Sequence, residues 1–312
     1  MRRKGFSHVV INTAHADTLG GFFTALGWRL QTEALDDAAV AFWGNTDAHG
    51  AVHRWRLPDG GSEVILLPAS IEEPLLRPVA CPVATPGGIF DINMRTDDSD
   101  WACGFLAAHG WRELVSPVAW HFGEVETKEG LFIQDDGIVM AVMQRLHPPL
   151  QGINFDRMSD IFNSTQMVTS VERTLAFLQL FDFEQFVDHR GPLPGEGARV
   201  LQLEDQPEET AHVRLSIAHP DGAMDGSIEL IDVPAHPLPS IDVAKLGGRG
   251  LRALCIPMED VERCYERFMS SEWSDRLIHP LSHRQLPGQL NTDIFSVAAP
   301  DGGRLDLYQC PD

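Results

Sequence analysis

The chain has 312 residues, and its 45 Asp and Glu residues outnumber its 24 Lys and Arg residues to give a formal net charge of -21 at pH 7. Such a charge disfavours nucleic acid and anionic membranes as partners, because binding to either needs a basic face. No stretch approaches the roughly 18 consecutive apolar residues of a membrane span, and the length predicts two domains.

Two similar heptads lie in the first half of the chain, FFTALGW at residues 22–28 and FLAAHGW at residues 105–111. Fourteen residues before each heptad is a short alternating segment, which contains His8 in the first copy and Asp91 in the second. Alternation followed by an amphipathic stretch predicts a strand and then a helix that ends in the heptad.

A third copy keeps the spacing of the heptad aromatics at Phe177 and Phe183, and Asn163 stands fourteen residues before the first of them. Thr169 and Glu172 have the spacing of a capping box, which predicts the start of the third helix.

A fourth copy begins LRALCIPMED, with an acidic helix start at Asp260. Its position equivalent to His8 is Ala253, with Arg252 as the alternative. Asp-Gly turns followed by alternating strands close the units, as PDGG at 58–61 and 300–303, DDG at 135–137 and DGSIELID from residue 225.

The chain therefore reads as four units of one strand, one helix and three strands, an α+β class. The composition of residues 147–152 (HPPLQG) is typical of a linker. We expect an N-terminal domain at residues 1–148 and a C-terminal domain at residues 153–312, each formed by two βαβββ units that pair into a cupped mixed sheet.

The N-terminal MRRKG is followed by the alternating FSHVVIN, which is not the apolar core of an export signal. The five cysteines are odd in number and lack CxxC spacing, a pattern typical of reduced thiols. These features predict a cytoplasmic protein.

The fourfold βαβββ order, with its LGW-type helix ends and its PDG turns before strands such as DLYQ, resembles the vicinal oxygen chelate superfamily. That superfamily groups glyoxalase I, bleomycin-resistance proteins, extradiol dioxygenases and several epimerases. The resemblance implies two tandem domains with cupped sheets. In the metal-dependent members the ligands come from the first and last strands of each unit, where inward side chains converge on one ion.

The resemblance thus singles out eight positions in this chain. The first strands contribute His8, Asp91, Asn163 and Ala253, and the last strands contribute Val64, Ala141, Glu229 and Asp306. Neither expected domain holds a complete ligand set, and the two histidines that an extradiol dioxygenase needs in its second domain are replaced by Asn163 and Ala253. A register shift by one residue would exchange Val64 for Glu63; the match between the two PDGG motifs favours Val64.

Three groups of side chains could carry chemistry. His8 and Asp91 could form an oriented acid-base pair, or His8 could merely satisfy a hydrogen bond. His121, between Trp120 and Phe122, could act as an acid or base beside a planar substrate, or it could face solvent.

The third group is a possible metal site. Asn163, Glu229 and Asp306 could offer three oxygens to Mg²⁺, Mn²⁺ or Ca²⁺, or line a polar cup without metal. No phosphate-binding glycine motif occurs, so no nucleotide cofactor is expected, and a divalent metal is the only cofactor with any support.

We expect a protein, monomeric or homodimeric, that holds or transforms a small aromatic or oxygen-rich molecule in one cup. Three classes compete: a metal-dependent dioxygenase, lyase or isomerase, a metal-independent enzyme, and a sequestering protein of the bleomycin-resistance type.

Overall fold

The computed structural model describes residues 4–34, 42, 51–193, 196–205, 212–234, 238, 240–241, 247–285 and 291–310. The four expected βαβββ units are present in these ranges. The first two comprise β1 (His8–Thr13), α1 (Ala16–Ala25), β2 (Arg29–Ala34), β3 (Ala51–Arg56) and β4 (Glu63–Pro68), then β5 (Asp91–Thr96), α3 (Ser99–Ala108), β6 (Arg112–Phe122), β7 (Val125–Ile133) and β8 (Val139–His147).

The third and fourth units follow the same order, with one added short helix and two 3-10 turns. They comprise β9 (Met158–Met167), α4 (Val171–Leu178), the turn Gln179–Phe181, β10 (Glu184–Pro192), α5 (Gly197–Val200), β11 (His212–His219) and β12 (Ser227–Asp232), then β13 (Gly250–Met258), α6 (Val261–Met269), the turn Ser274–Arg276, β14 (Leu277–Gln285), β15 (Asn291–Ala298) and β16 (Arg304–Gln309). None of the helices in the described ranges is long and apolar enough to cross a bilayer.

The predicted helix starts are borne out in one case and displaced in another. Asp260 caps α6, since its carboxylate accepts a hydrogen bond of 2.9 Å from the amide of Arg263. At α4 the capping residue is Ser170, which accepts from the amide of Arg173, so the capping box expected at Thr169 is wrong by one residue. The Thr169 hydroxyl instead donates to Asp301 over 2.8 Å.

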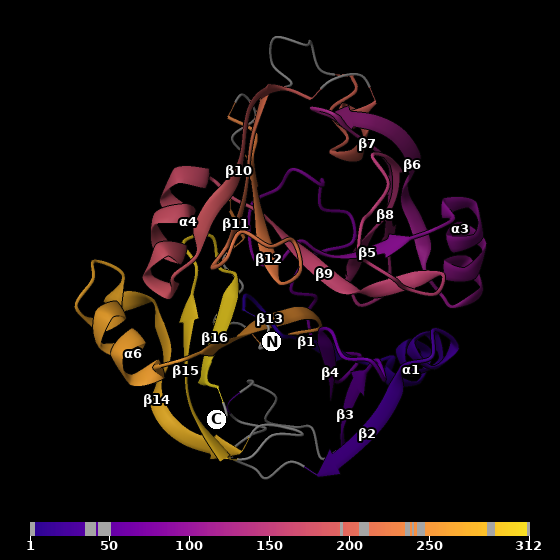
Figure 1. Cartoon of the computed structure of the whole chain (residues 1–312). Helices are drawn as coiled ribbons and strands as arrows, with labels where there is room; N and C mark the ends of the chain where they lie inside the picture. Colours follow the sequence, from indigo (N-terminus) through magenta and orange to yellow (C-terminus); the bar gives the residue numbers. More distant parts are fainter. Residues whose placement is uncertain are drawn as a thin grey trace.

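Two curled mixed sheets of eight strands each form the body of the protein (Figure 1). In the first sheet the strand order is β14-β15-β16-β13-β1-β4-β3-β2, and in the second it is β10-β11-β12-β9-β5-β8-β7-β6. The α+β fold class of paired βαβββ units is therefore confirmed. We call the concave face of each sheet its cup.

The pairing of the units differs from the expectation. The first sheet joins units one and four through the antiparallel pair β1 and β13, and the second joins units two and three through β5 and β9. The expected boundaries, 1–148 and 153–312, therefore do not separate the two sheets. The second sheet is contiguous in sequence, and the first is built from the two ends of the chain.

The helices explain why consecutive units lie together without sharing a sheet. α1 packs beside α3, and α4 packs beside α6, on opposite sides of the molecule (Figure 1). The ring of Phe22 in α1 lies 5.9 Å from that of Phe105 and 5.5 Å from that of Trp111, so the two repeated heptads pack against each other. The ring of Phe177 lies 6.4 Å from that of Phe268 in the other pair. Consecutive units meet through aromatic helix contacts, which leaves their sheets to pair elsewhere.

Candidate functional site

A row of four side chains crosses the cup of the first sheet at the junction of its two units. His8 on β1 pairs with Glu63 on the parallel strand β4 and with Cys255 on the antiparallel strand β13. Cys255 in turn pairs with Asp306 on β16. Because paired residues of neighbouring strands point to the same face, these four positions lie side by side. They correspond to the first and last strands of units one and four.

The register of β4 corrects the sequence prediction: Glu63, not Val64, faces the cup. Val64 belongs to the hydrophobic core on the helix side of the sheet. The reason lies in the turn, where Gly61 adopts a φ of +111°. Gly303, the equivalent residue of the second PDGG motif, does not have a positive φ. The residue that faces the cup therefore lies one position closer to the motif in β4 than in β16. Asp160 holds the first turn by accepting a hydrogen bond of 2.8 Å from the amide of Ser62.

His8 is buried and held at both ring nitrogens. Its Nε2 lies 3.3 Å from the carboxylate of Glu63, and its Nδ1 lies 2.7 Å from the hydroxyl of Ser7. That hydroxyl is also 2.9 Å from the phenol of Tyr308, whose ring meets the imidazole edge-on. Arg54 forms an ion pair with the same carboxylate of Glu63. Burial alone would raise the pKa of Glu63, but the hydrogen bonds and charges of His8 and Arg54 outweigh it and lower that pKa to about 2.

The other two residues of the row are Cys255 and Asp306, and the charge of Asp306 is neutralised by Arg304. Asp306 accepts hydrogen bonds of 2.7 Å from Arg304 Nε and 2.5 Å from the Ser296 hydroxyl. Arg304 is fully buried, and its Nη2 donates to the backbone oxygen of Phe42 over 2.9 Å. Its Nη1 has no hydrogen-bond partner within the described part of the chain. Burial, reinforced by the charge of Asp306, raises the pKa of the Cys255 thiol well above its usual value, so Cys255 stays protonated.

These four side chains do not fit a divalent metal. Metal ligation requires free carboxylate oxygens and a deprotonated thiol, whereas a guanidinium occupies each carboxylate and the thiol keeps its proton. Across the described ranges, no group of three His, Cys, Asp or Glu side chains is arranged so that it could hold a metal ion.

The structure does not assemble the predicted site groups. His8 lies in the first sheet and Asp91 in the second, so they cannot form an acid-base pair. The predicted oxygen ligands are also divided, since Asn163 and Glu229 belong to the second sheet and Asp306 to the first. Both errors have one cause, the pairing of unit one with unit four.

His121 does not line a cup either. It is exposed near the end of β6, where it pairs with Glu126 on β7. The neighbouring Trp120 points the other way, into the second cup, and its indole nitrogen donates to the carboxylate of Glu129 over 2.9 Å. The side chain of Phe122 lies outside the described residues.

The second cup contains three carboxyl groups that lie close enough for their charges to affect one another's pKa: Asp91 on β5, Glu129 on β7 and Glu229 on β12. Asp91 accepts a hydrogen bond of 3.0 Å from the amide of Thr165, whose hydroxyl lies 3.0 Å from Glu229. Burial raises the pKa of Asp91 to about 7, against the lowering effect of Thr165. Burial and the charge of Asp91 raise the pKa of Glu229 to about 7.

For Glu129, burial and then the charges of Glu229 and Asp91 raise the pKa to about 8. Sequence reasoning missed this residue because it lies on a middle strand, outside the positions that the repeat compares. Its alternation with the cup-facing Leu131 and Ile133 is the only signal in the sequence that it points inward.

Apolar side chains from two connecting segments fill much of the second cup. Val83 and Ala84, from the connection between β4 and β5, pack there with Val200 of α5 and the adjoining Leu201. Arg77 fixes the first segment, since its guanidinium donates to three backbone carbonyls within that segment.

Comparison with known proteins shows the fold. No protein-family model matches the chain, and no curated protein matches it in sequence. Among solved structures, glyoxalase I from Zea mays superimposes with a TM-score of 0.65 at 14% identity, covering 98% of this chain and 92% of that one. A point mutant of the same enzyme gives a TM-score of 0.67 at 15% identity, with the same coverage.

A putative dioxygenase from Bacillus subtilis superimposes with a TM-score of 0.57 at 12% identity, and the match covers 100% of this chain and 87% of that one. These similarities span both sheets and all four units. The chain therefore has the tandem βαβββ fold of the vicinal oxygen chelate superfamily.

Proposed function

We propose that the protein is a metal-independent enzyme that acts on a small, oxygen-rich molecule in the cup of the first sheet, with His8 as the acid-base group. The observation that carries this proposal is the contact of His8 with a carboxylate on one nitrogen and a hydroxyl on the other. A carboxylate that hydrogen-bonds one nitrogen of an imidazole fixes the orientation of the ring, as proton transfer requires.

The arginines of the same cup support an oxygen-rich or anionic substrate. Arg304 Nη1 is a buried donor that has no hydrogen-bond partner among the described residues. Arg252 is buried close enough to Arg304 that burial and this like charge lower the pKa of Arg252 to about 10. Guanidinium groups are well suited to carboxylates and carbonyl oxygens because their donors form a rigid fork. Glyoxalase and dioxygenase labels on proteins with this fold are consistent with small-molecule chemistry.

The guanidinium partners of Glu63 and Asp306 also support chemistry without a metal. An ion placed in this row would have to displace Arg54 and Arg304, which would leave buried cations without a counter-charge. We therefore expect purified protein to contain no stoichiometric transition metal by elemental analysis. Added Mn²⁺, Fe²⁺ or Ni²⁺ should not raise the melting temperature. Stoichiometric metal, or strong stabilisation by one of these ions, would refute metal independence.

The catalytic role is tested by incubating the protein with a panel of small 2-oxo acids, hydroxy acids and phenols and following each compound by NMR. The wild type should convert at least one compound, and His8→Asn should abolish that conversion while still unfolding cooperatively, at a lower melting temperature because Glu63 loses one of its partners. His121→Asn is the matched control, since this histidine is exposed and distant from the cup, and it should leave turnover unchanged. A compound that binds in the first cup and is recovered unchanged would instead indicate a carrier or sequestering protein.

A further inference from the structure

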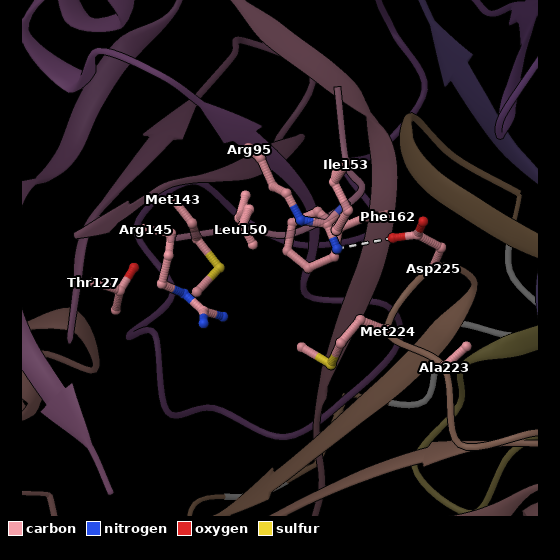
Figure 2. A pocket seen from close by; sticks show the side chains of 10 residues that line it. All are labelled: Arg95, Thr127, Met143, Arg145, Leu150, Ile153, Phe162, Ala223, Met224 and Asp225. Atoms are coloured by element: carbon pink, nitrogen blue, oxygen red, sulfur yellow. Dashed lines mark hydrogen bonds and ion pairs between the residues drawn. The ribbon is translucent and has the colours of Figure 1, made fainter. Parts of the chain in front are cut away.

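A cavity of about 300 Å³ lies at the end of the second cup that the connecting segments leave unfilled (Figure 2). Strands β5, β7, β8 and β9 line it, together with the linker that follows β8 and the turn before β12. This size is at the lower end of the range for pockets that bind small molecules.

Most of the cavity wall is apolar. Figure 2 shows Met143 and Leu150 on one side, with Phe162, Ile153 and Met224 on the other. Methionine thioethers and an aromatic ring provide a deformable surface for a hydrocarbon or aromatic body.

Two arginines share this wall, and only one has a counter-charge. Arg95 donates to Asp225 over 2.8 Å and stacks 3.8 Å from the centre of the Phe162 ring. Arg145 has no hydrogen bond or ion pair with any described residue, and Figure 2 shows its guanidinium extending into the open part of the cavity. Burial and the like charge of Arg95 lower the pKa of Arg145, and the negative charge of an anion placed beside Arg145 would offset both effects.

Glu129, an acidic residue of the second cup, does not neutralise the charge of Arg145. Glu129 pairs with Met143 across β7 and β8 and so borders the cavity. Partial burial and the charges of Glu229 and Asp91 raise the pKa of its carboxyl group to about 8, so the group is largely uncharged at neutral pH. The charges on the cavity wall are thus those of Arg95, Arg145 and Asp225, which leave one positive charge unmatched.

We propose that this cavity binds a monocarboxylate with an apolar or aromatic body, and that Arg145 anchors the carboxylate. A single unmatched guanidinium suits one carboxylate, whose two oxygens fit its fork of donors. A phosphate, with three strong acceptor oxygens, would leave acceptors facing methionine and phenylalanine side chains. The proposal is independent of the function assigned to the first sheet, because the two cups share no lining residue.

The test uses benzoate, with benzamide as its uncharged analogue and inorganic phosphate as a competitor without an apolar body. Binding is followed in the full chain by calorimetry and by the methyl resonances of Met143 and Met224. Benzoate should bind in a saturable manner and shift both methyl resonances, whereas benzamide and phosphate should bind at least about tenfold more weakly.

Arg145→Met should weaken benzoate binding by about tenfold or more, and Arg145→Lys should restore part of the loss. Arg112→Met removes an exposed arginine of β6 and should leave binding unchanged. His8→Asn should also leave it unchanged, which separates this site from the first cup. Failure of benzoate to bind, equal binding by Arg145→Met, or equal affinity for phosphate would each overturn the proposal.

Discussion

Replacing Glu129 by glutamine should change how the stability of the protein depends on pH. In the folded state burial and the charges of Glu229 and Asp91 raise the pKa of Glu129 to about 8 from a usual value of 4.5. A carboxyl group whose pKa is raised by folding favours the folded state while it is protonated, and this contribution is lost as pH rises through the folded-state pKa. Glutamine keeps the oxygen that accepts from Trp120 but cannot ionise.

The magnitude follows from the two pKa values. Their difference of about 3.5, at about 1.4 kcal/mol for each pH unit, sets a ceiling of about 5 kcal/mol. Glu129 keeps some contact with solvent, so we expect the wild type to lose about 3 kcal/mol of unfolding free energy through this residue between about pH 5 and about pH 9. Glu129→Gln should match the wild type near pH 5 and be more stable by a similar amount near pH 9.

The assay is urea unfolding followed by tryptophan fluorescence at a series of pH values. Glu124→Gln, which removes an exposed carboxylate from the turn before β7, is the matched control and should follow the wild-type curve. If Glu129→Gln also follows the wild-type curve up to about pH 9, the inference that Glu129 is buried and protonated is wrong.

Three further predictions test the first sheet and the helix layer. Glu63→Gln leaves the buried guanidinium of Arg54 without its counter-charge and should lower the unfolding free energy by about 3 kcal/mol in urea at neutral pH. The wild type should lose this contribution only as pH falls from about 4.5 towards 2. An unchanged denaturation midpoint at neutral pH would contradict the ion pair. Gly5→Ala should lower the melting temperature sharply, because φ is +78° and a Cβ atom would lie 2.2 Å from a backbone oxygen, whereas the control Gly21→Ala, in open space on α1, should raise it slightly. A double-mutant cycle of Phe22→Leu and Phe105→Leu should give a coupling energy of about 0.5–1.5 kcal/mol, and strictly additive effects would mean that the two heptads do not stabilise each other.

The order of elements could be predicted from the sequence because each unit repeats a local pattern. Alternation, helix ends and Asp-Gly turns all depend on neighbouring residues, and they placed the first strands at His8, Asp91 and Asn163 correctly. The choice of which units share a sheet depends on contacts between helices that are far apart in the chain. The periodicity of a single unit does not show which other unit shares its sheet, so the expected pairing of consecutive units was wrong.

The candidate site depended on a finer detail. Because Gly61 has a positive φ, Glu63 faces the cup in place of Val64. The turns at residues 58–61 and 300–303 have the same sequence, PDGG, so the sequence does not show this difference. The sequence does not single out Glu129 or Arg145 as candidate functional residues, since their importance depends on charged and buried groups on other strands. For Glu129, alternation along β7 indicates only that the side chain points inward. A repeat in the sequence identifies equivalent positions of the units, whereas the balance of charges in a cavity is visible only in the folded structure.

The pairing of β1 with β13 also determines when the protein can mature on the ribosome. The strands of the second sheet run from β5 to β12 without interruption, so that sheet can close while the chain is still being translated. Strands β1 to β4 can pair with the rest of the first sheet only after β13 has been synthesised. The contact between Ser7 and Tyr308 forms only after 301 further residues have been added to the chain. The His8 network is thus completed by a segment that is synthesised after every strand of the second sheet, so a nascent chain that stalls before β16 would carry the second sheet and no first-sheet site.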